Sequence, residues 1–323
     1  MKILVTGGAG FIGSHLSERL IQRGHKVSVI DDLSTGRMNN LDSIISDHNF
    51  KFTQGSILDM ELLTSLIADS DYVFHLAAAV GVFNIVNNPL NSLLTNIRGT
   101  ENVLEAASKF DVPVLLTSSS EVYGKNISDS LKESDDRILG SPVTLRWSYS
   151  EAKAIDESLA FAYFQEKKLQ TRIIRFFNTV GPRQLGNYGM VVPRFIQSAL
   201  ENRPISVYGS GKQTRCFAHV YDVIDALEEV AFASNTVGKV INIGNEIEIS
   251  ILDLATKIVL ETKSKSQIVF VSYEKAYGDG FEDMERRVPN LGLIKSLVGW
   301  NPKRDLTTII EDISAEMKVN LRV

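Results

Sequence analysis

The chain has 323 residues, 44% of them hydrophobic, so it is long enough to bury a full core in one large domain or two joined domains. The formal net charge of −5 excludes the broad basic footprint of a nucleic-acid partner, and the apolar runs are too short to span a bilayer. A single cysteine, Cys216, excludes an internal disulfide, and no metal-ligand cluster stands out. With no signal peptide before the first strand, we expect a soluble, cytoplasmic protein without a metal.

The first element is a β-type run at Lys2–Thr6, followed by a glycine-rich turn and a helix that ends at Gly24. The turn holds Gly7, Gly8, Gly10 and Gly13. The first of the spaced glycines allows a tight turn, the second lets the backbone approach a pyrophosphate, and the third lets the helix pack closely on the strand. The order strand, glycine turn, helix therefore predicts a dinucleotide site. The alternative is a glycine turn that serves packing only.

The second strand, Val27–Ile30, ends in Asp31. In dinucleotide-binding folds an acid at this position meets the adenosine ribose hydroxyls. A carboxylate there would repel the extra phosphate of NADP, so the sequence predicts NAD.

Strands and helices then alternate along the chain. We expect strands at Phe50–Gln54, Tyr72–Ala77, Val112–Ser118 and Gln170–Phe176, and helices from about Met60, over Leu90–Phe110 and from near Tyr149. Repeated strand-helix-strand units form a parallel sheet with helices on both faces, and ligands bind at the carboxyl ends of its strands.

The regular alternation of strands and helices changes beyond Gly181. Helices are expected at Val191–Glu201, from Tyr221 and from Ser250, and strands at Ile205–Tyr208 and Val240–Ile243. We interpret residues 1–180, with returns near 218–245, as the NAD-binding domain. Residues 181–323 are interpreted as a smaller substrate-binding domain that is interleaved with the first, so the boundary between the two is not sharp.

Two further stretches, Thr117–Gly124 and Arg146–Lys153, should meet the glycine turn at the carboxyl edge of the sheet. Tyr149 and Lys153 are four residues apart, so they share one face of a helix. A nearby ammonium favours phenolate and lowers the pKa of a tyrosine, as a phenolic general base requires. Ser119 is placed to hydrogen-bond the same reacting hydroxyl. In isolation this tyrosine-lysine spacing is more often a surface pair, and the dinucleotide turn upstream is what favours catalysis.

Several motifs together resemble the extended short-chain dehydrogenase/reductases that act on nucleotide sugars. They are TGGAGFIGSHL at 6–16, HLAA at 75–78, SSSEVYG at 118–124, the Tyr149 and Lys153 pair, and RFFNTVGPRQ at 175–184. The resemblance covers essentially the whole chain. It implies a doubly wound Rossmann-type sheet, tightly held NAD, a nucleotide-sugar substrate under the C-terminal domain, and a homodimer joined through two helices of each subunit.

The same resemblance implies the roles of individual residues. It makes Ser119, Tyr149 and Lys153 the catalytic triad. The implied NAD contacts are Gly7, Gly10, Phe11, Ile12, Gly13, Asp31, Asp32, Ser56, Ile57, Leu76, Ala77, Ala78, Asn96, Tyr149 and Lys153. The implied substrate contacts are Ser120, Asn178, Arg194, Arg215 and Arg287. Ser56 departs from the aspartate that the family commonly places near the adenine, which weakens the contact expected there.

The triad implies a shared first step, in which Tyr149 takes the proton of the sugar 4-hydroxyl while the hydride on carbon 4 passes to NAD. An epimerase then returns the hydride to the other face of the keto sugar. A dehydratase needs a base at carbon 5. A decarboxylase starts from a uronic acid, whose oxidation gives a β-keto acid that loses carbon dioxide readily.

Glu121 helps to distinguish these reactions, because this chain resembles dehydratases and decarboxylases in carrying a glutamate at this position. Ser120 replaces the aspartate expected of 4,6-dehydratases. Arg146 and the stretch Tyr277–Pro289 resemble UDP-glucuronate decarboxylases and UDP-apiose synthases, and Arg287 matches the arginine that those enzymes bring to the sugar ring. A guanidinium can bind a carboxylate through two parallel hydrogen bonds. We therefore predict a UDP-glucuronate decarboxylase with Glu121 and Arg287 in the catalytic site.

Other interpretations stay open. Arg286 and Arg287 as a surface pair or diphosphate contact, or Glu121 as an acceptor for loop N–H groups, would favour a UDP-hexose or UDP-glucuronate 4-epimerase. A 4,6-dehydratase ranks below these because Ser120 is not the expected aspartate, and a non-catalytic dinucleotide-binding protein ranks below them because the triad is complete. His75 is interpreted as a packed strand residue and Cys216 as a small residue beside a loop, rather than as a base and a nucleophile.

Overall fold

The computed structural model describes residues 1–81, 88–186, 190–277 and 284–320. Its centre is a seven-stranded parallel sheet in the order β11-β6-β5-β4-β1-β2-β3. The strands are β1 (Lys2–Thr6), β2 (Lys26–Asp31), β3 (Phe50–Gln54), β4 (Tyr72–His75), β5 (Val114–Ser119), β6 (Thr171–Phe176) and β11 (Val240–Ile243). The strand order reverses between β1 and β4, as in dinucleotide-binding sheets, so the expected Rossmann-type fold is confirmed.

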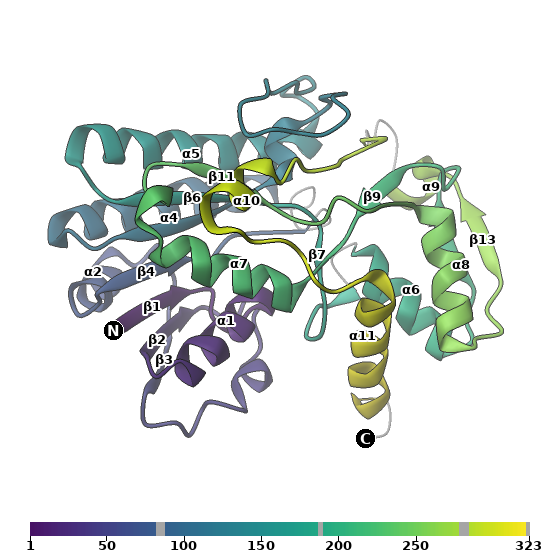
Figure 1. The fold of residues 1–323 in the computed structure, drawn as a ribbon, viewed down its shortest axis with the longest axis horizontal. Helices are drawn as coiled ribbons and strands as arrows, with labels where there is room; N and C mark the ends of the chain where they lie inside the picture. The colour runs from purple at the N-terminus through teal and green to yellow at the C-terminus, as the bar shows by residue number, and fades with distance from the viewer. Residues whose placement is uncertain (82–87, 187–189, 278–283, 321–323) are drawn as a thin grey trace.

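Helices cover both faces of this sheet (Figure 1). One face packs against α1 (Phe11–Gln22), α7 (Val220–Phe232) and α10 (Gly292–Val298). The other face packs against α2 (Met60–Ala68), α4 (Pro89–Phe110) and α5 (Ser148–Lys167). Alternate side chains of β1 supply both cores, with Ile3 and Val5 in one and Leu4 in the other, as a strand buried on both faces requires.

A second group of elements lies at one end of the molecule, on the right of Figure 1. Its core joins α6 (Val191–Leu200), α8 (Ile251–Thr262) and α11 (Leu306–Asn320) to the short pair β8 (Ile205–Tyr208) and β13 (Ile268–Val271). Other short elements are β7 (Thr179–Val180), β9 (Thr214–Cys216), β10 (Ala218–His219), β12 (Glu248–Ser250) and α9 (Tyr273–Tyr277). We propose that this core marks the smaller domain.

The chain crosses between the two cores more than once. After β8 and β9 in the smaller group, α7 packs beside α1 and β11 pairs with β6 at the edge of the main sheet. The chain then returns to the smaller group through β12 and α8. None of the helices in the ranges that the structure describes is both long and apolar enough to cross a membrane.

Strand β4 ends at His75, two residues before the expected end at Ala77. At this point the backbone N–H of Leu76 still donates to the Thr6 carbonyl, but that of Ala77 turns to the Thr6 hydroxyl. The register places Thr6 beside both Ile30 and His75. The loops after β1, β2 and β4 therefore leave the sheet side by side.

Candidate active site

A cavity of about 1000 Å³ runs along the carboxyl ends of the main strands and under the smaller group of elements. Its lining includes every site residue predicted from the sequence except Asn96. One part of the cavity is lined by the glycine turn, Asp31 and the loop after β4. The part under the smaller group is lined by Arg194, Arg215 and Tyr208. The topology thus brings residues from distant parts of the sequence to one site, as expected at the switch point of such a sheet.

The glycine turn leaves no room for side chains. Gly7 has a φ of +70°, and a Cβ there would lie 2.8 Å from the Ala77 backbone. A Cβ at Gly13 would collide with the Gly7 carbonyl. Helix α1 begins after Gly10, and no side chain in the described part of the protein caps it. The first N–H groups of the helix can therefore meet an anionic group, which is what a dinucleotide pyrophosphate requires.

Asp31 lies at the end of β2 and borders the cavity. Its Oδ2 accepts a hydrogen bond from the Ala9 N–H at 2.9 Å, and its Oδ1 accepts one from the Leu33 N–H at 2.8 Å. Burial raises the pKa of this carboxyl group, while these two backbone hydrogen bonds oppose the rise. Each carboxylate oxygen has a further lone pair, so Asp31 can still accept hydroxyl groups of a ribose.

Asn96 is not among the residues that line the cavity, and its contact with NAD stays a prediction. Its buried side chain accepts from the Ala79 N–H at 2.7 Å and donates to the Ala79 carbonyl at 3.2 Å. Both ends of the amide are thus used to fix the loop after β4. Thr95, its neighbour on α4, borders the cavity instead.

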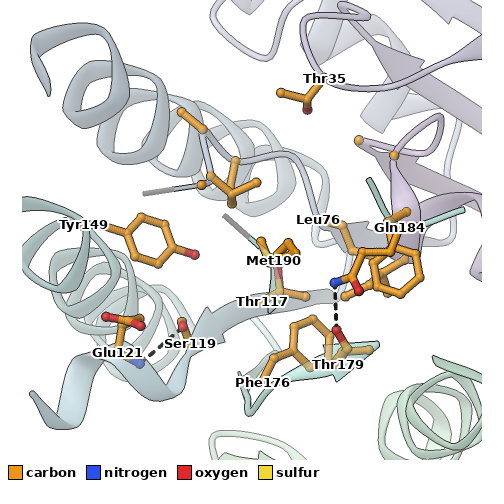
Figure 2. A pocket seen from close by; sticks show the side chains of 18 of the residues that line it. Thr35, Leu76, Thr117, Ser119, Glu121, Tyr149, Phe176, Thr179, Gln184 and Met190 are labelled. Atoms are coloured by element: carbon orange, nitrogen blue, oxygen red, sulfur yellow. Dashed lines mark hydrogen bonds between the residues drawn. The ribbon is translucent and has the colours of Figure 1, made fainter. Parts of the chain in front are cut away.

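Tyr149 points its hydroxyl group into the cavity from α5, and Ser119 and Glu121 lie beside it (Figure 2). Ser119 ends β5, where its hydroxyl group accepts from the Glu121 N–H at 3.2 Å. Burial raises the pKa of Tyr149, and the carboxylates of Glu121 and Asp156 raise it further, while the nearby Ser119 hydroxyl group opposes the rise. The pKa of Tyr149 is thus raised, whereas the sequence predicts that Lys153 lowers it.

The reason lies in the partners of Lys153. Its buried ammonium donates to the Thr117 carbonyl at 3.0 Å and to Asp156 Oδ2 at 3.2 Å. The Asp156 carboxylate offsets much of the positive charge that the tyrosine would otherwise experience. The four-residue spacing of Tyr149 and Lys153 says nothing about this third group.

Glu121 is held between two arginines at the end of the cavity next to Tyr149. Arg287 Nη1 lies 2.7 Å from Glu121 Oε1, and Arg146 Nη1 lies 2.7 Å from Oε2. Burial by itself would raise the pKa of Glu121, but the charges of Arg287 and Arg146 hold it well below its usual range. Two arginines and one carboxylate leave one net positive charge in this cluster. Arg287 Nε is buried without a hydrogen-bond partner among the described residues.

Arg286 and Arg287 take different positions although they are adjacent in the sequence. Arg286 pairs with Glu248 on the surface, at 2.8 Å, whereas Arg287 is 7% exposed and also donates to the Ser120 hydroxyl. Both follow Met284, and residues 278–283 of the stretch Tyr277–Pro289 lie outside the described part. The sequence could not separate the two arginines, because their burial depends on where the chain returns to η2 (Ser120–Tyr123).

The part of the cavity under the smaller group carries a second set of polar groups. The Arg194 guanidinium lies over the Tyr208 ring, 4.2 Å from its centroid, and Asn178 donates to the Cys216 carbonyl. Tyr208 was not among the residues predicted from the sequence, since a tyrosine at the end of a short strand carries no motif.

His75 and Cys216 lie away from the chemistry. His75 hydrogen-bonds the hydroxyl groups of Thr6 and Thr100, at 2.8 and 3.2 Å, and burial lowers its pKa to about 3. Burial raises the pKa of the Cys216 thiol to about 12. His75 is therefore a weak base whose two ring nitrogens are both engaged, and Cys216 stays a neutral thiol at neutral pH, so neither suits the role of catalytic base or nucleophile.

Comparison with known proteins adds to this geometry. A family model described as GDP-mannose 4,6 dehydratase matches residues 4–313. The UDP-N-acetyl-alpha-D-glucosaminuronate decarboxylase of Bacillus cytotoxicus is 41% identical, over 93% of this chain and 92% of that protein. UDP-glucuronic acid decarboxylase 1 of Xenopus tropicalis is 36% identical, over 93% of this chain and 68% of that protein.

Among solved structures, a UDP-glucuronic acid 4-epimerase from Bacillus cereus, in complex with UDP-glucuronic acid and NAD, superposes with a TM-score of 0.89. The two sequences are 29% identical, and the match covers 99% of this chain and 100% of that one. The family model covers far more than half of the chain, and the site contains the glycine turn, Ser119, Tyr149 and Lys153 in one cavity. The chain therefore belongs to the GDP-mannose 4,6 dehydratase family, within the extended short-chain dehydrogenase/reductases.

Proposed function

We propose that the protein is an NAD-dependent enzyme that oxidises carbon 4 of a UDP-linked uronic acid and removes its carboxyl group, with UDP-glucuronate as the leading substrate. The observation that carries the proposal is the buried cluster of Glu121, Arg146 and Arg287 beside Tyr149. Its net positive charge lies in a low-dielectric cavity, where it attracts a carboxylate more strongly than it would in water. Relatives that are named as decarboxylases of UDP-uronic acids support the same assignment.

The glycine turn and Asp31 are the residues that would hold NAD. The turn offers uncapped N–H groups to a pyrophosphate, and Asp31 offers acceptors to a ribose while disfavouring a 2′-phosphate. When bound, NAD supplies the acceptor for the hydride that leaves carbon 4. The Bacillus cereus structure that was solved with NAD supports this choice of cofactor.

Tyr149 and Ser119 would act on the sugar 4-hydroxyl. The Tyr149 oxygen takes the hydroxyl proton, and Ser119 hydrogen-bonds the same region of the substrate. The resulting ketone is β to the carboxylate, so the bond from carbon 5 to the carboxyl carbon breaks with its electron pair passing toward the keto oxygen. Tyr149, now protonated, can stabilise the charge that develops on this oxygen.

Arg287 would bind the substrate carboxylate. It contacts Glu121 through Nη1 and lines the cavity, so the rest of its guanidinium group lies next to the space that the sugar would occupy. Glu121 and Arg146 then fix the orientation of Arg287 rather than contact the sugar carboxylate themselves.

A 4-epimerase is the second candidate, because the epimerase of the Bacillus cereus complex binds UDP-glucuronic acid. The 4,6-dehydratase reaction is disfavoured by Ser120, which has no acidic proton for the leaving hydroxyl group.

We also propose a cytoplasmic homodimer that associates through α4 and α5. Leu90 on α4 and Ile155 on α5 are 68% and 42% exposed, which supports an interface on these helices.

The test is to incubate the purified protein with NAD and either UDP-glucuronate or UDP-N-acetylglucosaminuronate. We expect release of carbon dioxide and a UDP-pentose lighter by that mass if the hydride returns to carbon 4, or a UDP-4-keto pentose lighter by a further two hydrogen atoms if the hydride stays on the cofactor. Tyr149→Phe should reduce the rate by roughly 100- to 10,000-fold, because the base for the hydroxyl proton is lost. Unchanged mass with inversion at carbon 4 would replace decarboxylation by epimerisation, and full activity of the Phe variant would remove Tyr149 from its role.

A further inference from the structure

Asp156 is a buried carboxylate for which the proposed reaction has no direct use. It lies on α5, three residues after Lys153, and it is 0% exposed. Its Oδ2 accepts a hydrogen bond from Lys153 Nζ at 3.2 Å. Two opposite charges at this spacing share one face of the helix, and each offsets the cost of burying the other.

Lys153 is thereby fixed from two elements. Asp156 holds the ammonium from α5, and the Thr117 carbonyl holds it from β5 at 3.0 Å. In the described part of the protein these are the two hydrogen-bond acceptors of Lys153, so one of its three N–H groups remains for a ligand in the cavity that it lines.

We propose that Asp156 is a positioning residue, whose carboxylate holds the Lys153 ammonium against β5 and so sets how much positive charge reaches Tyr149. The proposal rests on the proposed function only in that Tyr149 is the base for the sugar hydroxyl. It therefore holds for decarboxylation and for 4-epimerisation alike.

The surrounding charges give the sign of the effect. Lys153 and Glu157 on α5 and the Thr100 hydroxyl on α4 lie around Asp156. Lys153 also faces His75 on β4, which is neutral at working pH, and Glu121 faces Tyr149. Apart from burial, the Glu121 and Asp156 carboxylates are what raise the pKa of Tyr149. Removing the charge at 156 while keeping an acceptor for Lys153 should therefore make the phenol easier to ionise.

Asp156→Asn and Asp156→Ala separate charge from positioning. Asparagine keeps the shape and an acceptor oxygen, whereas alanine leaves Lys153 without its helix partner. Glu151→Gln is the matched control, because it removes an exposed carboxylate from the same helix that faces Arg137 instead of Lys153. The first measurement is kcat/KM against pH for the full-length holoenzyme.

For Asp156→Asn we expect the acid limb of the profile to move to lower pH. The ratio of its kcat/KM to that of the parent protein should be larger at about pH 6 than at about pH 8, by roughly threefold or more. Asp156→Ala should lose roughly tenfold or more in kcat across the profile, because the ammonium is no longer held in place. Glu151→Gln should follow the parent profile, since exposed charges are screened.

A second measurement needs no substrate. Ultraviolet difference titration of each protein against its own Tyr149→Phe counterpart isolates the ionisation of Tyr149 from that of the other tyrosines. The phenol of Asp156→Asn should ionise at lower pH than that of the parent. If the Asn variant changes neither the titration nor the pH profile, the proposal is overturned. If the parent converts no UDP-uronic acid, the proposed function fails, while the titration still decides the role of Asp156.

Discussion

Arg287 shows how a single side chain gains a role from its surroundings. It differs from its neighbour Arg286 in burial and in its partner, a carboxylate inside the cavity instead of one on the surface. The residue type is the same, so only the position of the backbone distinguishes the two. A planar guanidinium can hold Glu121 through one nitrogen and a substrate carboxylate through others, which a lysine ammonium cannot reproduce in the same geometry.

Arg287→Lys should therefore lower kcat/KM for the uronic acid by roughly 100-fold, or about 2.7 kcal/mol of transition-state stabilisation. Arg286→Lys is the matched control and should stay close to the parent protein, because Arg286 is exposed and binds Glu248. Steady-state kinetics of carbon dioxide release give both values. Equal losses in the two variants would assign the effect to folding instead of carboxylate binding.

At the level of elements, the glycine turn was predictable because its geometry is local. The backbone at Gly7 is left-handed, and the position of Gly13 has no room for a Cβ. Both positions require glycine, so a short stretch of sequence is enough to identify them. The alternation of strands and helices likewise identifies a parallel sheet. By contrast, the two-residue error at the end of β4 and the hydrogen bonds of Asn96 to Ala79 both arise from contacts with residues that are not adjacent in the chain.

Gly13→Ala tests the turn. The added methyl group would collide with the Gly7 carbonyl, and overpacking of this kind costs about 1–3 kcal/mol. We expect NAD to bind roughly tenfold or more weakly by isothermal titration calorimetry, since the loop that faces the pyrophosphate must shift. Gly24→Ala strains a left-handed residue that has no neighbour within 4 Å, so its NAD affinity should be unchanged. A normal affinity in Gly13→Ala would show that the turn does not contact the cofactor.

For the whole molecule, buried histidines couple stability to pH. His15 packs against Tyr221 and hydrogen-bonds the Pro182 carbonyl, and burial lowers its pKa to about 4. The pKa of the buried His75 is lowered to about 3. In the unfolded chain both groups titrate near their ordinary value, so the unfolded state binds more protons than the folded state below that value. The folded protein must therefore lose stability as the pH falls through this range.

The free energy of unfolding should decrease from pH 7 to pH 5, and His15 should account for about 2 kcal/mol of the decrease. His15→Gln can keep a donor to Pro182 but cannot be protonated, so its decrease should be smaller by about this amount. His48→Gln, which replaces a side chain that is 89% exposed, should show the parent decrease. Urea unfolding at the two pH values measures all three. Identical decreases in all three proteins would mean that His15 is not buried in its neutral form.

The path of the chain between its two cores has a consequence for protein synthesis. Strand β6 keeps an open edge until β11 pairs with it, and β11 is made some sixty residues later, after part of the smaller core has left the ribosome. A nascent chain that stops near residue 180 therefore exposes an unpaired strand and lacks the α7 cover over α1. Such a fragment should bind to chaperones or aggregate instead of folding as an independent nucleotide-binding module.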